Sequence, residues 1–278
     1  MGCSRKHWSY SALNQYLRCP LQYYFERVLK LPKLTVNSGL VLGGAIHEAL
    51  AHYHIRLQKG VSTNISHLER VFAAAWKSRE FDQFIQYKTG ESRASQMAIG
   101  IELLNTYLQE PTPPNILFVE RELTVPLINS AGEFLETPLV AVLDLVTLTE
   151  EGLQVHEIKT SGRAYGQSEV DTSLQASCYA HAADIQFAAK VAFEFTVMVK
   201  TKQPKLQRIT TERTEKDFGR LGDLVQMVER AVLNEIYYPI ESPLNCTGCP
   251  FRGPCREWQS QPAFIPSENL ELNGAPSC

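Results

Sequence analysis

One stretch of the chain, residues 139–161, places a carboxylate inside an apolar segment. It opens with LVAVLDLV, from Leu139 to Val146, which is typical of a strand buried on both faces. Asp144 lies within this run. A buried carboxylate is costly without a partner, so Asp144 requires a cation or hydrogen bonds. The stretch therefore indicates either a structural ion pair or a functional site within a sheet.

A turn and a second strand follow this first run. Residues 149–152, TEEG, interrupt the apolar pattern, and the chain continues with LQVHEIKTS. Because strand side chains alternate, Glu157 and Lys159 share one face of this second strand. A turn centred on residues 150–151 would place Asp144 directly opposite Glu157, with Cβ atoms roughly 4.5–5.5 Å apart. Two carboxylates at that distance repel each other, and a divalent cation between them would remove the conflict.

Two carboxylates and a lysine are the parts of a site that hydrolyses a phosphodiester bond. Mg²⁺ prefers oxygen ligands, and it commonly takes one or two carboxylates and leaves its other positions to water and phosphate. A metal ion of this kind activates water and neutralises the charge of a phosphate group. The alternative is a buried ion pair with Lys159 that only rigidifies the sheet, since short acidic–x–Lys sequences are common. The hairpin alone leaves both interpretations open.

The whole chain limits the class of protein. Its 278 residues suffice for one large domain or two small ones, and its net charge of −3 means that any nucleic-acid contact must use a local groove. No apolar run reaches the roughly 20 residues of a membrane span, and no signal peptide is visible, so we expect no membrane partner and a cytoplasmic location. Seven cysteines then favour metal or redox chemistry over disulfides.

Helices are expected before residue 110 and mainly strands after it. The spacing of apolar residues predicts helices over residues 11–29, with an interruption at Cys19-Pro20, and over residues 40–58, 64–87 and 91–109. Strands are predicted over residues 116–128, in the hairpin 139–161, and over residues 191–200 and 206–211, with helices over residues 171–187 and 215–236.

Several polar side chains can be explained by a structural or solvent-exposed role as well as by a functional one. A lone helical histidine such as His47 is more often structural than a ligand, and His54 is expected on the surface. Glu120 alternates with apolar neighbours, which favours a solvated strand face. The basic residues between Lys200 and Arg208 are expected in a solvated turn. Gln175 and Tyr179 lie four apart on one helical face, where they are either a polar pair in a site or core.

The segment CTGCPFRGPC, residues 246–255, gathers three cysteines within ten positions. A tetrahedral metal ion or a 4Fe–4S cluster requires four sulfur ligands. Cys246, Cys249 and Cys255 supply three, and Cys278 lies beyond a Pro- and Gly-containing tail. A zinc ribbon would require a second CxxC pair, which the sequence lacks. The fourth ligand therefore remains to be found.

Taken in order, these motifs resemble the RecB-like branch of the PD-(D/E)XK nucleases, in the subgroup that carries an iron–sulfur cluster. This subgroup includes the nuclease domains of RecB/AddB-type recombination enzymes and the RecB-like exonucleases associated with CRISPR systems. The resemblance covers nearly the whole chain. Its motifs, in order along the sequence, are SYSALNQYLRCPLQYYF, GGAIHEAL, AVLD, HEIKT and LQASCY.

The resemblance implies a role for particular residues. It implies that Cys19 is the fourth ligand of a 4Fe–4S cluster, and that His47 joins the two carboxylates in binding Mg²⁺ or Mn²⁺. It also implies that Lys159 is catalytic and that the Gln-x-x-x-Tyr helix positions the lysine or the DNA backbone. One departure is Ala141, because the family usually has Gly three residues before its first Asp. The implied cluster ligands are Cys19, Cys246, Cys249 and Cys255; the implied site residues are His47, Asp144, Glu157, Lys159, Gln175 and Tyr179.

The fold that the resemblance implies is a restriction-endonuclease-like α/β core, with a mixed central sheet flanked by helices. We expect one domain over residues 1–278: a helical part at 1–110, a catalytic core at 115–237, a cysteine segment at 238–260 and a tail at 261–278.

The implied function is a metal-dependent DNA exonuclease. It would act on single strands or ends in recombination, repair or CRISPR-related processing, with a helicase, recombination or CRISPR protein as partner. The alternative is a non-catalytic iron–sulfur module that holds DNA ends for such a partner, and a weaker one is a zinc-stabilised interaction domain.

Overall fold

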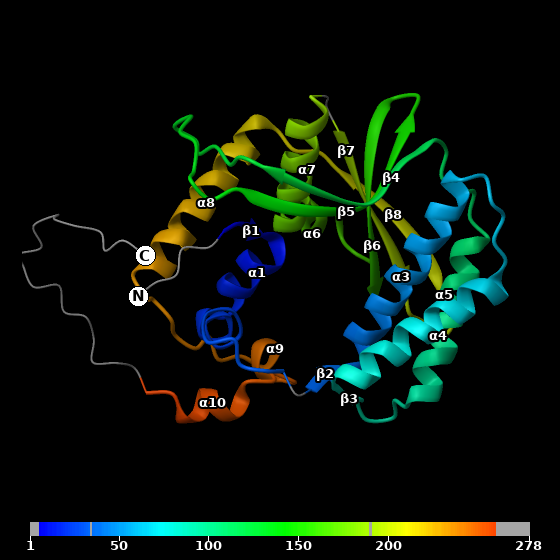
Figure 1. Cartoon of the computed structure of the whole chain (residues 1–278), viewed down its shortest axis with the longest axis horizontal. Helices are drawn as coiled ribbons and strands as arrows, with labels where there is room; N and C mark the ends of the chain where they lie inside the picture. The colour runs from blue at the N-terminus through cyan, green and yellow to red at the C-terminus, as the bar shows by residue number, and fades with distance from the viewer. Residues whose placement is uncertain (1–5, 34, 189–190, 260–278) are drawn as a thin grey trace, which may run out of the picture.

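A computed structural model of the chain describes residues 6–33, 35–188 and 191–259. A mixed sheet of six strands lies at its centre, with helices on both faces (Figure 1). The predicted α/β class, with a mixed central sheet flanked by helices, is confirmed. The predicted tail at residues 261–278 lies outside the described residues. None of the described helices is long and apolar enough to cross a membrane.

The first elements are short because the sequence interrupts them. Strand β1 (Trp8–Ser9) leads into α1 (Tyr10–Arg18), which Ser9 caps by accepting the backbone amide of Ala12. The helix ends where Cys19 adopts an extended conformation, with φ −163° and ψ 100°, directly before Pro20. Helix α2 (Pro20–Tyr23) and a π-helical turn, η1 (Tyr24–Val28), follow. The predicted interruption at Cys19-Pro20 is therefore confirmed.

Three long helices form the layer on one face of the sheet. They are α3 (Ser38–Gln58), α4 (Ile65–Asp82) and α5 (Arg93–Leu108). Two short strands, β2 (Thr35–Asn37) and β3 (Phe84–Gln86), pair in parallel beside them. The core of this layer includes Ile158 and Met198 from the sheet. The helices predicted over residues 40–58 and 91–109 are confirmed, but the one predicted over residues 64–87 ends at Asp82, because residues 84–86 pair with β2 as a strand. His54 is fully buried against Tyr107, so its predicted surface position is wrong.

The central sheet contains one parallel pair between long strands. Its long strands are β4 (Ile116–Val125), β5 (Leu139–Thr149), β6 (Gly152–Ser161), β7 (Val191–Val199) and β8 (Lys205–Thr211). Strands β6 and β7 are parallel, whereas the pairs β4–β5, β5–β6 and β7–β8 are antiparallel. The chain reaches β7 from β6 through the helices α6 (Gln167–Asp171) and α7 (Leu174–Phe187).

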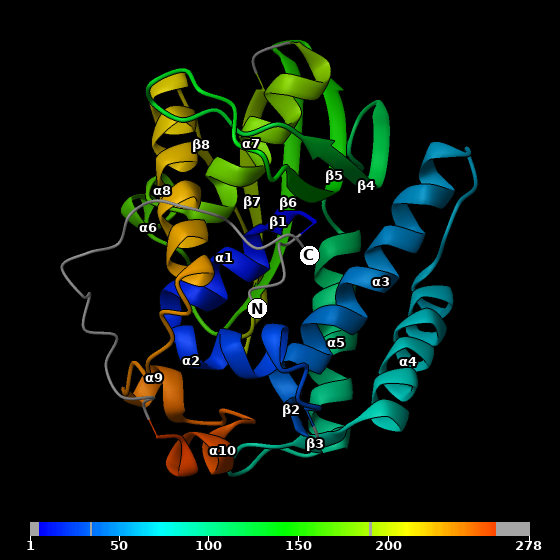
Figure 2. The ribbon, with the colours of Figure 1, turned by 60° about the vertical axis from the view of Figure 1, so that its left-hand side comes forward.

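Helices α1, α7 and α8 (Glu215–Leu233) cover the other face of the sheet. Helix α7 begins three residues later than predicted, because the Ser173 side chain caps it by accepting the amide of Ala176. Two short helices, α9 (Pro243–Cys246) and α10 (Arg252–Glu257), then lie beside α2 (Figure 2). The segment before α9 is tied to α2, since Leu21 N donates to Tyr238 O at 3.1 Å, and Asn245 Nδ2 of α9 donates to Arg18 O at 2.9 Å.

Strand β5 shares one edge between two partners. Its C-terminal half pairs with β6 from Leu145↔His156 to Thr149↔Gly152, and its first residues pair in parallel with β1. Strands β5 and β6 therefore separate just beyond the Leu145↔His156 pair; we call this point the fork. The predicted turn at residues 149–152 is confirmed. The predicted direct pair of Asp144 with Glu157 is not formed, because the fork opens one residue before it.

Candidate active site

Asp144 lies in the fork, where its side chain makes the contacts that a neighbouring strand would otherwise make. Its Oδ2 accepts the backbone N–H of Ile158 at 2.8 Å, and His47 Nδ1 lies 3.4 Å from the same oxygen. The carboxylate is 9% exposed. Burial favours the neutral form of His47, but the hydrogen bond and charge of Asp144 outweigh it and raise the pKa of His47. Asp144 thus has the partners that its burial requires, one on β6 and one on α3.

Helix α3 approaches the sheet closely enough to deliver His47. A Cβ atom at Gly43 would lie 3.2 Å from Oγ1 of Thr160, next to Lys159 on β6. Glycine at this position permits the close approach, and His47 follows one helical turn later on the same side. Gly43, the first glycine of the GGAIH sequence, therefore has a local structural role.

Glu157 is the most deeply buried acid of the site, at 3% exposed. Its Oε1 accepts hydrogen bonds from Lys159 Nζ at 2.7 Å and from Gln175 Nε2 at 2.6 Å. Its Oε2 is also buried, and within the described chain it has no hydrogen-bond partner. Burial and the nearby Asp144 raise the pKa of Glu157 to about 7, against the opposing effect of Lys159. A buried oxygen without a donor is a fitting ligand for a cation.

Lys159 is a cation in this arrangement. Burial alone would lower its pKa, but the charges of Glu157 and Asp144 and the hydrogen bond to Glu157 outweigh burial and raise it. The side chain is 27% exposed, so its ammonium group remains accessible beside the carboxylates. A raised pKa favours electrostatic stabilisation over a role as a general base.

Helix α7 brings its Gln-x-x-x-Tyr pair to the same place. Gln175 is buried and donates to Glu157, as given above. The ring of Tyr179 packs edge-on against Tyr10, with ring centroids 6.5 Å apart, and lies 6.5 Å from the ring of Phe193. Burial, followed by the charge of Glu157, raises the pKa of Tyr179. Gln175 therefore contacts a site residue, whereas Tyr179 lies within an aromatic wall beside it.

Glu120 belongs to the site although the sequence favoured a solvated strand face. Ligand atoms of His47, Glu120 and Asp144 all lie within 4.8 Å of one another. The pairs Val119↔Leu145 and Arg121↔Leu143 flank Glu120, which places it opposite Asp144. Its φ of 49° is unusual for a strand residue. Glu120 is exposed, as expected. The pairing of β4 with β5 nevertheless turns its carboxylate towards the fork, and no local sequence pattern reveals this pairing.

The donor set of this site fits a hard divalent cation. His47, Glu120 and Asp144 could hold one ion between an imidazole and two carboxylates. Glu157 does not belong to this set of mutually close ligand atoms among the described residues, although its Oε2 is buried there without a hydrogen-bond donor. Carboxylate and water ligands suit Mg²⁺ and Mn²⁺, and imidazole is compatible with the latter. The six implied site residues form two contact groups: His47 with Asp144, and Glu157 with Lys159 and Gln175, to which Tyr179 is joined by a side-chain hydrogen bond with Gln175.

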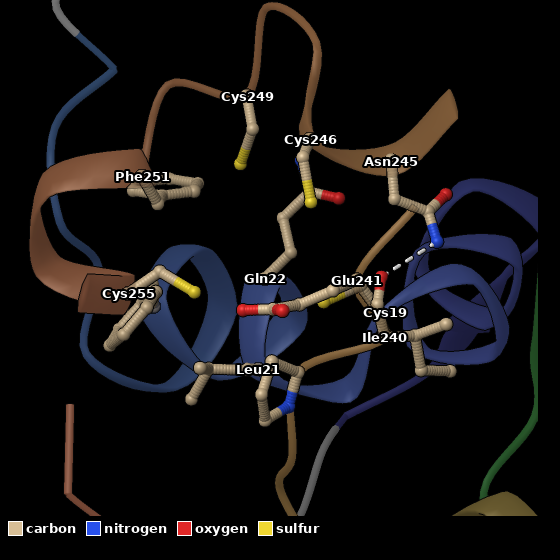
Figure 3. A pocket seen from close by; sticks show the side chains of 12 residues that line it. Cys19, Leu21, Gln22, Ile240, Glu241, Asn245, Cys246, Cys249, Phe251 and Cys255 are labelled. Carbon is tan, nitrogen blue, oxygen red and sulfur yellow. Dashed lines mark hydrogen bonds between the residues drawn. The ribbon is translucent and has the colours of Figure 1, made fainter. Parts of the chain in front are cut away.

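The four cysteines implied as cluster ligands line one pocket (Figure 3). Cys19 follows α1, Cys246 ends α9, and Cys249 and Cys255 lie before and within α10. Leu21, Phe25 and Phe251 form the apolar wall of the pocket. Burial and the neighbouring thiols raise the pKa of Cys249 and Cys255. By contrast, Cys178 is fully buried in the core beside the sheet, as predicted.

The spacing of these thiols is wide for one ion. No three of the four Sγ atoms lie within 4.8 Å of one another, since such a set occurs among the described residues only at His47, Glu120 and Asp144. A tetrahedral zinc ion, with Zn–S distances of about 2.3 Å, would hold its sulfurs about 3.8 Å apart. The Sγ atoms of the described cysteines are therefore farther apart than the ligands of one tetrahedral zinc ion.

Comparison with known proteins agrees with this geometry. The family model described as the PD-(D/E)XK nuclease superfamily matches residues 7–256. A crystal structure of a candidate exonuclease from Eubacterium rectale has a TM-score of 0.53 and 13% identity to this chain, covering 94% of this chain and 91% of that one. The crystal structure of SSO0001 has a TM-score of 0.32 and 14% identity, with coverage of 83% and 91%. No curated protein matches the sequence.

Proposed function

The chain belongs to the PD-(D/E)XK nuclease superfamily, and we propose that it is a metal-dependent DNA exonuclease that hydrolyses phosphodiester bonds of single strands or DNA ends. The observation that carries the proposal is the buried Glu157, with one oxygen held by Lys159 and Gln175 and the other without a donor in the described chain. The carboxylate of Asp144 beside it completes a pair that a cation would stabilise.

The residues that would hold Mg²⁺ or Mn²⁺ are Asp144, Glu157 and His47, with Glu120 as an additional ligand. When bound, the metal ion lowers the pKa of a coordinated water and neutralises charge on the scissile phosphate. Lys159 places a positive charge where negative charge develops on the phosphate in the transition state. Gln175 fixes the orientation of Glu157 by donating to Oε1.

We also propose that the cysteine pocket holds a 4Fe–4S cluster with a structural role. Four thiolates on opposite ends of the described chain, an apolar wall and the wide sulfur spacing support this assignment. Ligation would then contribute directly to the free energy of folding. On the same grounds we propose that the helical part, the sheet and the cysteine segment work as one domain.

The pathway is also a proposal. A place in recombination, repair or CRISPR-related processing, with a helicase or recombination protein as partner, follows from the resemblance to RecB-like nucleases. A location in the cytoplasm fits such a role. These assignments await tests in cells.

The test uses end-labelled single-stranded and double-stranded DNA with Mn²⁺ and anaerobically purified protein. We expect cleavage by the wild type and by Glu122→Ala, which removes an exposed carboxylate from the same strand as Glu120. We expect none by Glu157→Ala or Lys159→Ala. Cleavage that survives Glu157→Ala would refute the site assignment. A wild type that binds DNA but does not cut it would instead favour the non-catalytic binding module.

A further inference from the structure

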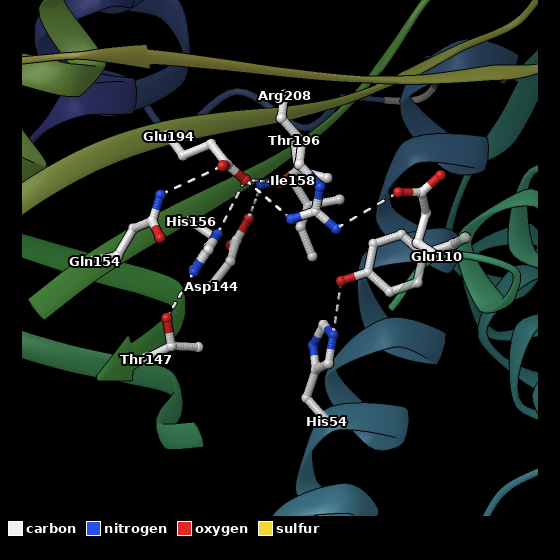
Figure 4. Close-up of polar contacts among 11 residues, drawn as sticks. His54, Glu110, Asp144, Thr147, Gln154, His156, Ile158, Glu194, Thr196 and Arg208 are labelled. Carbon is white, nitrogen blue, oxygen red and sulfur yellow. Dashed lines mark hydrogen bonds and ion pairs between the residues drawn. The ribbon is translucent and has the colours of Figure 1, made fainter. Parts of the chain in front are cut away.

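A row of side-chain contacts crosses three strands directly beside the fork (Figure 4). His156 on β6 lies 2.8 Å from Thr147 Oγ1 on β5 through its Nε2, and 3.1 Å from Glu194 Oε1 on β7 through its Nδ1. The exposed fractions are 1% for Thr147 and 6% for each of the other two. We call Thr147, His156 and Glu194 the three-strand bridge.

Further donors hold Glu194 in one orientation. Thr196 Oγ1 donates to its Oε1 at 2.8 Å, and Arg208 Nη1 donates to the same oxygen at 3.3 Å. Gln154 Nε2 donates to Oε2 at 3.3 Å. Burial would raise the pKa of Glu194, but His156 and the other donors lower it, so the carboxylate is charged. With both oxygens engaged, Glu194 is a fixed end point for the bridge.

Arg208 extends the row towards the surface. Its side chain is exposed on β8, and its Nη2 lies 4.0 Å from a carboxylate oxygen of Glu110. Arg208 is therefore solvated as predicted, but it lies in a strand and not in the turn. Arg208 also neutralises the charge that Glu194 carries into the sheet, which makes a buried carboxylate tolerable at this position.

His156, the central residue of the bridge, lies at the last rung of the hairpin, and Thr147 lies two residues from that rung, opposite Gln154. His156 pairs with Leu145, and the next residues beyond this pair are Asp144 on β5 and Glu157 on β6. Backbone pairing between these strands ends here, so it does not by itself fix how far the two carboxylates separate. A buried hydrogen-bonded row is satisfied in one arrangement only, because each displaced polar atom would lose its partner. The row can therefore fix the strands where the ladder cannot.

Stability alone does not require these residues. Replacing buried polar or ionic groups by apolar residues of similar volume is often neutral or stabilising. A strand covered on both faces, as β6 is, would accept an aliphatic residue at position 156. The polar side chains of the three-strand bridge thus call for a role other than holding the sheet together.

We infer that the three-strand bridge sets the separation of the Asp144 and Glu157 carboxylates and is a positioning element of the metal site. The inference rests on the proposed function, since it concerns the same cation. Its members touch neither the ion nor DNA and act through the strands that carry the ligands. A bridge that only stabilised the sheet would alter the melting temperature and leave the metal affinity of the folded protein unchanged.

The test measures Mn²⁺ affinity rather than cleavage. His156→Leu removes the bridge, and Thr147→Val removes one contact while keeping the shape of the side chain. Tyr107→Phe is the matched control, because it removes a buried hydroxyl 2.9 Å from His54 Nε2 and leaves the hydrogen bonds of the three-strand bridge in place. Free Mn²⁺ is followed by electron paramagnetic resonance during titration of each full-length protein, and folding is checked by melting in EDTA.

We expect His156→Leu to weaken Mn²⁺ binding by about tenfold or more, as loss of outer-shell support commonly does. Thr147→Val should show a smaller loss in the same direction, and it keeps the test open if His156→Leu fails to fold. Tyr107→Phe should bind like the wild type. Wild-type affinity in folded bridge variants would overturn the inference while the proposed function stands. If the wild type fails to bind Mn²⁺, or Glu157→Gln binds it equally well, both fall.

Discussion

The carboxylate of Asp144 does for Ile158 what a neighbouring strand would otherwise do. Its Oδ2 accepts the Ile158 amide at 2.8 Å, at the point where β5 and β6 have separated. A backbone donor that the fork would leave unpaired is thereby satisfied. The same side chain thus has a structural duty in the fork and a proposed duty towards the metal.

Two substitutions of Asp144 separate these duties. Asp144→Asn keeps an oxygen acceptor for Ile158 but removes the charge, so we expect loss of Mn²⁺ binding and cleavage with little loss of stability. Asp144→Ala also leaves the buried amide unpaired, which should cost about 1–3 kcal/mol of unfolding free energy. Melting in EDTA beside a nuclease assay measures both. Equal stability of the two variants would show that the hydrogen bond to Ile158 contributes nothing.

The hairpin could be predicted because its determinants are local. The turn at residues 149–152 sets the register of β5 and β6, and alternation then places Glu157 and Lys159 on one face. In the same way, helical spacing places the Gln175 side chain on the same face of its helix as Tyr179. These residues are assembled by neighbours in sequence, so their patterns are visible there.

The fork could not be predicted, because it depends on a distant segment. Strand β1, at residues 8–9, pairs with the edge of β5 that β6 leaves free. Glu120 was missed for a related reason, since its place opposite Asp144 depends on the register of β4 and on a left-handed backbone. His54 is buried only because Tyr107 of another helix supplies its partner. In each case the deciding contact is tertiary.

The raised pKa of Glu157 predicts how stability depends on pH without metal. Its folded-state value of about 7 exceeds the ordinary value of about 4.3 in an unfolded chain. Between these values Glu157 binds more protons in the folded protein than in the unfolded one, so the stability that this group contributes is fully present below about pH 4 and is lost as pH rises through 7. Glu157→Gln lacks this titration. We therefore expect the melting temperature of the variant to rise relative to wild type between pH 5 and pH 8.

This measurement is made in EDTA, because a bound cation would reverse the preference for the neutral acid. Glu122→Gln is the control, since its exposed carboxylate should show no such trend. An equal difference in melting temperature between wild type and Glu157→Gln at both pH values would mean that Glu157 keeps an ordinary pKa.

Ala141 predicts a stability effect without a functional one. It is 1% exposed and packs in the core beside the sheet, where the family usually has glycine. Ala141→Gly would remove a buried methyl group and add backbone freedom to a strand, which together should cost about 1–2 kcal/mol. The melting temperature should fall by several degrees while Mn²⁺ affinity is retained. A rise in melting temperature would show instead that the methyl group crowds the core.

The cysteine pocket predicts different consequences for two cysteines of the same chain. Cys19 lines the pocket with three others, whereas Cys178 lies fully buried in the main core. If four thiolates hold a cluster, Cys19→Ser should lose most of the iron and unfold at lower temperature, because it opens the link between α1 and α10. Cys178→Ser should lose some stability by burying a hydroxyl, but the folded protein should keep its iron.

Iron and zinc contents per folded chain, with the visible absorption spectrum, distinguish the outcomes. We expect about four irons and a brown colour in wild type and in Cys178→Ser. One zinc per chain and a colourless protein would instead favour the zinc-stabilised alternative, and would require the Sγ atoms to move closer than their present spacing. Full iron in Cys19→Ser would remove Cys19 from the ligand set and leave the C-terminal cysteines to find another partner.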